Sequence, residues 1–229
     1  VVPEFGDFLR VYKPDVVHFH HVLLGGVEAI FLGRRILPRA RIVMTLHDYW
    51  LLCEFWHLMT PDQQLCSGPD SAEKCAACYL KFRKPSREQA GLTLNYMQKR
   101  IVAFGDAFRQ LDAAIAPSRY LAATFEKFGL PGVQVNPLGM PACVPQPKAS
   151  HRGIVFGFVG QIIARKGIEV LLQAFSRIGR HDVSLEIWGS SNDAAYLQRI
   201  VRQAGSIANV DYKGAYTPTD LREIQDWII

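Results

Sequence analysis

Short apolar runs alternate with longer amphipathic segments along most of the chain, and this alternation limits the fold more than any other feature. The apolar runs are rich in β-branched residues and predict buried strands at 15–20, 41–46, 112–116, 133–136, 154–159, 184–188 and 210–213. The amphipathic segments predict helices at 26–37, 86–111, 118–128, 167–178, 194–204 and 217–225. Strands that alternate with helices in this way form parallel sheets, so the sequence predicts an α/β protein.

A proline-rich stretch divides the alternation into two series. It contains Pro137, Pro141, Pro145 and Pro147 and shows little periodicity, which is typical of a linker. We therefore expect two Rossmann-like domains with parallel sheets, at 1–140 and 153–229, joined by a linker at 141–152. The chain begins without Met and stops as an apolar run begins, so we expect both domains to be partial, truncated at the two ends of the chain.

Composition points to a globular protein in a reducing compartment. The 229 residues are 49% hydrophobic and 21% charged, and no uncharged apolar run is long enough to cross a bilayer. The opening residues show no secretory signal, and the five cysteines are an odd number, which argues against a disulfide framework. We therefore expect a cytoplasmic location.

Residues 47–85 lose the periodicity, and we expect an irregular loop there. Four cysteines lie in it: Cys53, Cys66, Cys75 and Cys78. The last two have the spacing of a zinc knuckle, and four thiolates would complete a tetrahedral structural zinc site. The alternative is that the four are separate buried cysteines of a reduced protein. A redox role is disfavoured, because no thioredoxin-like pattern surrounds Cys75.

Polar residues follow the predicted strands. Ligands of open parallel sheets bind beyond the carboxyl ends of the strands, which makes these positions candidates for a binding cleft between two domains. In the first series they are His20 and the pair His47–Asp48, whereas His18 is expected to pack under the sheet. In the second series they include Gln161 and Gly189.

Arg165, Lys166 and Gly167 stand at the start of a predicted helix. A helix N-terminus attracts anions, and two adjacent cations would make the site suitable for a diphosphate. The alternative is that Arg165 and Lys166 are an ordinary pair of surface cations that binds no ligand. The segment is neither a Walker A loop nor the dinucleotide-binding glycine fingerprint.

These motifs, in this order, resemble the retaining GT-B-type glycosyltransferases of group 1, or family 4. The matching segments are Pro14–His20, Thr45–Trp50, Ala116–Tyr120, Asn136–Met140, Gly157–Ala174, Leu185–Gly189 and Val210–Gly214. The resemblance implies a GT-B-like fold with an acceptor-side N-terminal domain and a C-terminal domain that binds a nucleotide sugar. It implies transfer of a sugar, of the hexosyltransferase type, to a glycan or lipid-linked glycan with retention. It also implies no catalytic metal and a place in polysaccharide or glycoconjugate biosynthesis.

The resemblance also assigns roles to individual residues. Lys166 matches the lysine that holds the donor diphosphate, whereas Gln161 stands where the family has an arginine. Gln161 can donate a hydrogen bond to phosphate but carries no charge, which Arg165 is then expected to supply. His47 matches the family's sugar-pocket histidine and is the expected catalytic residue, with His20 and Asp48 on the acceptor side. The family's glycine-rich loop would precede the chain, and its carboxylate motif would follow it.

Two other functions remain open on the sequence alone. One is a non-catalytic nucleotide-sugar or glycan-binding protein on the same scaffold, which Gln161 favours. The other is a zinc-organised interaction module built on the cysteine loop.

The charge of the chain is unevenly distributed. The net charge is +5, and residues 81–100 hold six Lys and Arg against Glu88 alone. A helix with apolar Leu92, Leu94, Tyr96, Met97, Ile101, Val102, Phe104 and Phe108 follows the basic segment 81–87. We expect the basic segment to steer the protein to the inner face of the plasma membrane as a peripheral protein, or to form a merely solvated surface. The apolar face of the helix either lies in the headgroup region or packs on the sheet of the first domain. No nucleic-acid partner is expected.

Overall fold

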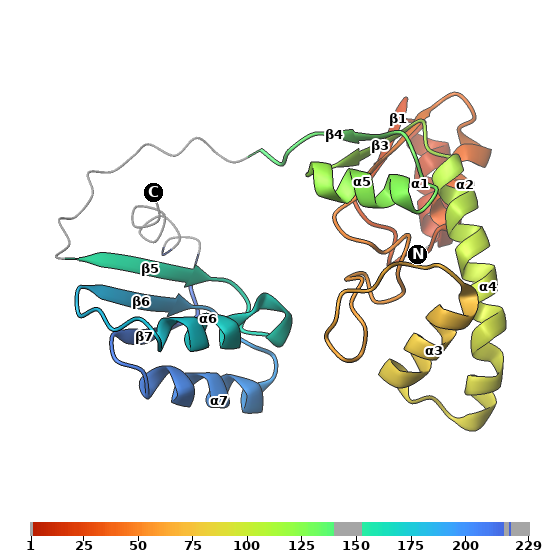
Figure 1. The fold of residues 1–229 in the computed structure, drawn as a ribbon. Helices are drawn as coiled ribbons and strands as arrows, with labels where there is room; N and C mark the ends of the chain where they lie inside the picture. Colours follow the sequence, from red (N-terminus) through yellow and green to blue (C-terminus); the bar gives the residue numbers. More distant parts are fainter. Residues whose placement is uncertain (1, 140–152, 218–219, 221–229) are drawn as a thin grey trace. The chain divides into compact units, whose positions relative to one another are not determined.

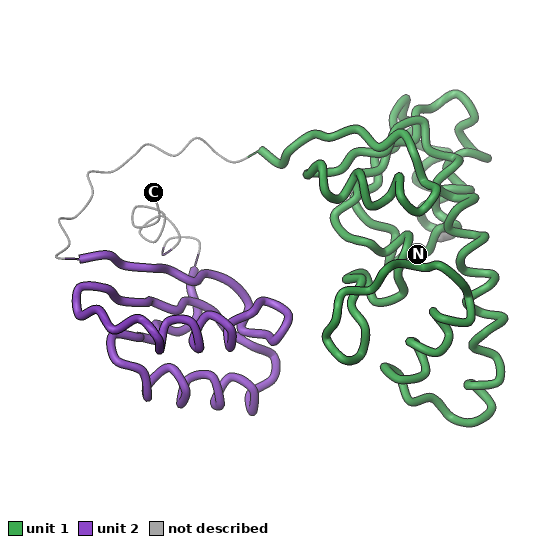
Figure 2. The backbone as a smooth tube through the Cα atoms, in the orientation of Figure 1, with its two compact units in different colours: residues 1–140 green, residues 141–229 purple. Residues whose placement is uncertain are grey.

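The chain forms two compact units, Val1–Met140 (unit 1) and Pro141–Ile229 (unit 2), shown in Figure 2. The computed structural model describes residues 2–139, 153–217 and 220. The predicted linker at 141–152 and most of the predicted helix at 217–225 lie outside the described residues.

Unit 1 is a four-stranded parallel sheet with helices packed against it (Figure 1). The strands follow each other across the sheet in chain order: β1 (Val16–Phe19), β2 (Arg41–Thr45), β3 (Ala113–Ala116) and β4 (Val133–Val135). The helices are α1 (Val2–Tyr12), α2 (Glu28–Ile36), α3 (Ala72–Arg83), α4 (Arg87–Arg109) and α5 (Arg119–Lys127), of which α3 packs on α4 and not on the sheet. The predicted α/β fold with parallel strands is confirmed.

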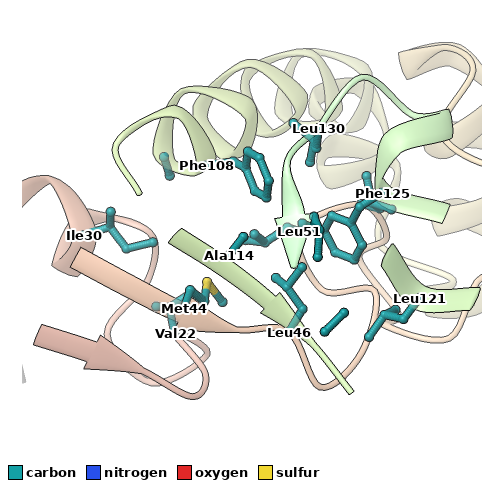
Figure 3. Packing of buried hydrophobic residues seen from close by; sticks show 14 of the residues in the cluster. Val22, Ile30, Met44, Leu46, Leu51, Phe108, Ala114, Leu121, Phe125 and Leu130 are labelled. Carbon is teal, nitrogen blue, oxygen red and sulfur yellow. The ribbon is translucent and has the colours of Figure 1, made fainter. Parts of the chain in front are cut away.

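The core of unit 1 lies between this sheet and its helices (Figure 3). Met44 of β2 and Ala114 of β3 are buried against Phe108 of α4 and Phe125 of α5. Small alanines in β3 leave room for the two large rings, which stack at 6.2 Å. This packing fixes the strands, and with them the loops at their carboxyl ends.

Unit 2 contains a three-stranded parallel sheet in chain order. Its elements are β5 (Ile154–Val159), the 3-10 turn η1 (Ala164–Lys166), α6 (Ile168–Phe175), β6 (Val183–Trp188), α7 (Ala194–Gly205) and β7 (Val210–Gly214). Alternate residues of β6 are buried, and Leu185 and Ile187 pack with Leu172 and Ile200 of the two helices. A strand that alternates in this way presents one face to the helices, and the other face carries its polar residues.

The prediction of an irregular loop at 47–85 is wrong in its second half, because α3 occupies Ala72–Arg83. Ser71 caps this helix by accepting a hydrogen bond from the Lys74 backbone N–H at 3.2 Å. The first turn is also rich in alanine and glutamate, which favour a helix. Periodicity missed α3 because only Ala76 of the helix is fully buried, so no apolar stripe marks it.

Candidate functional site

His20 and His47 meet at one edge of the unit 1 sheet. β1 and β2 are parallel neighbours with Phe19 opposite Met44, so the residues that follow the two strands lie side by side. His20 Nδ1 is 3.0 Å from His47 Nε2, and the two rings stack at 5.3 Å. Both side chains are exposed. A single proton between the facing nitrogens satisfies this bond and leaves the other ring nitrogens free to bind a hydroxyl.

Asp48 fixes the turn that carries His47. The Leu23 backbone N–H donates to His21 Nδ1 at 2.9 Å, which places the imidazole proton on Nε2. His21 Nε2 then donates to Asp48 Oδ2 at 3.2 Å. The other carboxylate oxygen of Asp48 accepts the Trp50 backbone N–H at 2.8 Å. Asp48 is thus held from both sides and orients the neighbouring His47.

The expectation that His18 packs under the sheet is wrong. In β1 it is Val17 that points inward, so His18 lies on the exposed side. Its Nε2 is 2.8 Å from Thr45 Oγ1, and its ring lies 4.4 Å from that of His20. Desolvation lowers the pKa of His18, and the charges of His20 and His47 lower it further. Protonation of His18 is therefore disfavoured by its burial and by the neighbouring His20 and His47.

In unit 2 the carboxyl ends of the strands approach each other at glycines. A side chain at Gly189 would place its Cβ 1.9 Å from the Gly160 carbonyl oxygen, so only glycine fits. The Gly189 N–H donates to the Gly214 carbonyl at 2.7 Å, and the Ile162 N–H donates to the Ser190 carbonyl at 2.8 Å. These contacts hold the loops after β5 and β6 together next to the start of α6.

Arg165 and Lys166 lie immediately before α6. They are part of η1, and Gly167 ends it with a φ of +74°, a left-handed conformation that lets α6 begin at once. Both cations are exposed, and among residues 153–217 neither forms an ion pair with a carboxylate. Gln161 is also exposed, directly after Gly160. Arg165 and Lys166 therefore stand as two exposed cations beside a helix N-terminus, an arrangement that in general attracts anions.

The four clustered cysteines line one pocket of about 240 Å³ in unit 1. Cys75 and Cys78 lie on α3 rather than in an irregular loop, which corrects the expectation for these two residues. Burial, together with the smaller effects of the neighbouring thiols Cys53, Cys66 and Cys78, raises the pKa of Cys75 to about 11. Within the described residues, no three candidate ligands already stand in a metal-binding arrangement.

Two contacts of the turn after β2 were not predicted from the sequence. Arg100 of α4 is buried, and its guanidinium lies 5.0 Å from the Trp50 ring centroid and 4.0 Å from that of Phe104. Burial raises the pKa of Tyr49, and the nearby Tyr120 of α5 raises it further, so the turn after β2 lies close to α5. A basic residue inside an otherwise ordinary helix gives no sequence signal of burial.

Family comparisons agree with this arrangement. A model described as Glycosyltransferase Family 4 matches residues 2–141, more than half of the chain. The chain belongs to glycosyltransferase family 4. A second model, described as Glycosyl transferases group 1, matches residues 143–226. No curated protein sequence matches the chain.

Solved structures show the same fold at low identity. A mutant of TarM from S. aureus, in complex with fondaparinux, α-GlcNAc-glycerol and UDP, is 12% identical with a TM-score of 0.58; the alignment covers 97% of this chain and 38% of that one. A glycosyltransferase from Rickettsia africae is 13% identical with a TM-score of 0.58, and the alignment covers 99% of this chain and 53% of that one. A UDP-forming α,α-trehalose-phosphate synthase from Burkholderia xenovorans, in complex with glucose-6-phosphate, is 13% identical with a TM-score of 0.56. The alignment covers 97% of this chain and 53% of that one. The family 4 chain thus spans roughly 38–53% of these proteins and shares the GT-B fold.

Proposed function

We propose that this family 4 chain belongs to an enzyme that transfers a sugar from a nucleotide diphosphate sugar to a glycan or lipid-linked glycan. The transfer would retain the anomeric configuration and serve polysaccharide or glycoconjugate synthesis. The observation that carries the proposal is the pair Arg165 and Lys166, exposed and without a carboxylate partner among residues 153–217, at the start of α6. Group 1 glycosyltransferases use nucleotide sugars as donors, and an unneutralised cation pair suits the diphosphate of such a donor.

The two cations would act mainly on the leaving group. As the bond between sugar and diphosphate breaks, negative charge grows on the diphosphate oxygen that departs. Lys166 and Arg165 would stabilise that charge, and charge-assisted hydrogen bonds to phosphate are about twice as strong as neutral ones. Gln161, next to the narrow Gly160–Gly189 contact, would donate a neutral hydrogen bond. No metal is required for this step.

The histidines of unit 1 would bind hydroxyl groups. His47 shares one proton with His20 and is oriented through Asp48, so its free ring nitrogen can meet a sugar hydroxyl in a fixed direction. A hydroxyl held in this way keeps the sugar oriented during transfer. We assign His47 to the transferred sugar and His20 and Asp48 to the acceptor side.

A turnover assay tests the proposal. The full-length protein is incubated with a panel of UDP-, GDP- and ADP-sugars, and release of the nucleoside diphosphate is measured with and without glycan acceptors. UDP-sugars come first, because the TarM complex contains UDP and the trehalose-phosphate synthase is UDP-forming. We expect turnover that His47→Ala lowers and that His181→Ala, an exposed histidine of unit 2, leaves unchanged. Nucleotide-sugar binding without any turnover would instead support the non-catalytic alternative, which Gln161 favours.

We further propose weak, salt-sensitive attachment to an anionic membrane surface. The basic residues at 81, 83, 84 and 87 are exposed around the junction of α3 and α4. Met97 and Phe108 of α4 are buried, whereas Leu92 and Leu94 are exposed. Positions two apart lie on different sides of a helix, so these leucines do not form one face that could insert. No helix among the described residues is long and apolar enough to cross a membrane.

A further inference from the structure

Four thiols from separate parts of unit 1 meet at the wall of one pocket. Two of them, Cys53 and Cys66, come from the loop between β2 and α3, and the other two, Cys75 and Cys78, come from α3 itself. All four are half-buried and free of disulfides. All four line the same pocket of about 240 Å³.

The backbone of each thiol is held in place. Cys75 and Cys78 are three residues apart on one helix, so their side chains share a face. Cys66 follows a small hairpin bridged at Met59 and Leu65, and its N–H donates to the Leu58 carbonyl at 2.8 Å. The Cys53 N–H donates to the Tyr49 carbonyl at 2.7 Å. The protein therefore presents two pairs of sulfur atoms on a preformed scaffold.

A hydrogen-bond donor and a cation lie next to the cysteines. The Gly68 backbone N–H donates to Cys66 Sγ at 3.4 Å, the kind of bond that supports a metal-bound thiolate. Lys74 Nζ lies next to the cluster, held 2.8 Å from the Gly68 carbonyl and by Ser67 and Asp70.

The loop before α3 contains little regular structure of its own. Between Thr45 and Ala72 the described backbone contains no helix or strand, only the isolated Met59–Leu65 bridge. A loop of this length is usually functional or held by a specific constraint. Leu51, Leu52 and Leu58 anchor its first half in buried positions. The second half, around Cys66, approaches α3 at the cysteine pocket.

We propose that Cys53, Cys66, Cys75 and Cys78 bind one structural zinc ion that ties this loop to α3. The four thiols become thiolates, and up to four protons leave when the ion binds. Because the sulfur atoms are not yet arranged around one point, the half-buried side chains must turn into the pocket as the metal enters. Four thiolates fill a tetrahedral shell and leave no open position, so the site is structural and not catalytic.

Metal analysis of the reduced, freshly purified protein is the first test. We expect about one equivalent of zinc per chain. Each single Cys→Ser substitution among the four should lower the zinc content clearly below that of wild type. Cys143→Ser, which removes a thiol outside the four, should leave it unchanged. A metal-free wild-type protein that also fails to take up zinc or cobalt would overturn the proposal, and so would full zinc content in the four Ser variants.

A second measurement stays informative if the Ser variants do not fold. Cobalt-loaded wild-type protein should show the absorption of a tetrahedral thiolate site. A thiol reagent should react with four more thiols after a chelator strips the metal, and proteolysis within 53–78 should speed up at the same time. Equal thiol reactivity and equal proteolysis with and without chelator would contradict the site, as would disulfides between these cysteines under reducing conditions. None of these readouts depends on glycosyl transfer.

Discussion

Arg100 of α4 forms a buried ion pair with Glu54 of the loop after β2, with Nε 2.8 Å from Oε2. Only 4% of the Arg100 side chain and 14% of the Glu54 side chain are exposed. Arg100 also donates to the Trp50 carbonyl, and Tyr96 donates to the same Glu54 oxygen at 2.9 Å. α4 is therefore fastened to the turn that follows His47, which makes Arg100 a positioning residue.

We expect Arg100→Met to destabilise unit 1 by about 3–5 kcal/mol, because it leaves the Glu54 carboxylate buried without its partner. Arg109→Met on the same helix is the matched control. Its ion pair with Asp106 is exposed, so it should cost less than about 1 kcal/mol. The free energy of unfolding from urea titrations measures both. The double variant Arg100→Met/Glu54→Leu should recover much of the loss, and a single variant as stable as the control would contradict the role of the pair.

The pH dependence of stability should report on His18. Desolvation lowers the pKa of His18 in the folded protein, so below the unfolded value of 6.5 the unfolded chain binds more protons than the folded one. Stability is therefore fully present above 6.5 and falls as the pH drops through 6.5 toward the folded pKa. Replacing His18 with Gln should flatten this part of the stability curve, and His181→Gln should not. An unchanged slope in His18→Gln would show that another group causes it.

Most regular elements could be predicted from the sequence because they have a local signal, but α1 and α3 were not predicted. β5 has the predicted bounds, and α4 lies within the predicted 86–111, opened by a capping box between Ser86 and Gln89. α3 was missed because it buries almost nothing on its own. The ends of β1 and β2 were predicted to carry the histidines, and the structure brings His20 and His47 into contact.

Other parts of the site depend on contacts between distant residues. The direction of His18 depends on the inward position of Val17, which the short run of apolar and histidine residues leaves ambiguous. The need for glycine at 189 arises from its closeness to the Gly160 carbonyl, 29 residues earlier in the chain. The burial of Arg100 likewise depends on Glu54. Local patterns cannot reveal such pairings.

Membrane attachment should depend on charge. Each basic residue near an anionic surface contributes about 1 kcal/mol, so replacing Lys81, Arg83, Lys84 and Arg87 with Ser should abolish sedimentation with anionic vesicles at low salt. The same number of Ser replacements at exposed Lys13, Arg35, Arg39 and Lys127 is the charge-matched control and should preserve binding. High salt should release the wild-type protein. Wild-type protein that ignores anionic vesicles at low salt would point to a soluble acceptor.

Binding of a nucleoside diphosphate to the Lys166 site tests the central claim most directly. Titration calorimetry of the full-length protein with UDP, GDP and ADP, and with their sugars, gives the dissociation constant of each. Lys166→Ala should weaken binding of the preferred ligand by about 1.5–3 kcal/mol, and Arg165→Ala should also weaken it because Gln161 supplies no charge. The exposed Arg177→Ala is the control in the same unit and should bind as wild type does. Loss of affinity in both site variants, with the control intact, is the result we predict; unchanged affinity in Lys166→Ala would contradict the assignment of this site to the donor.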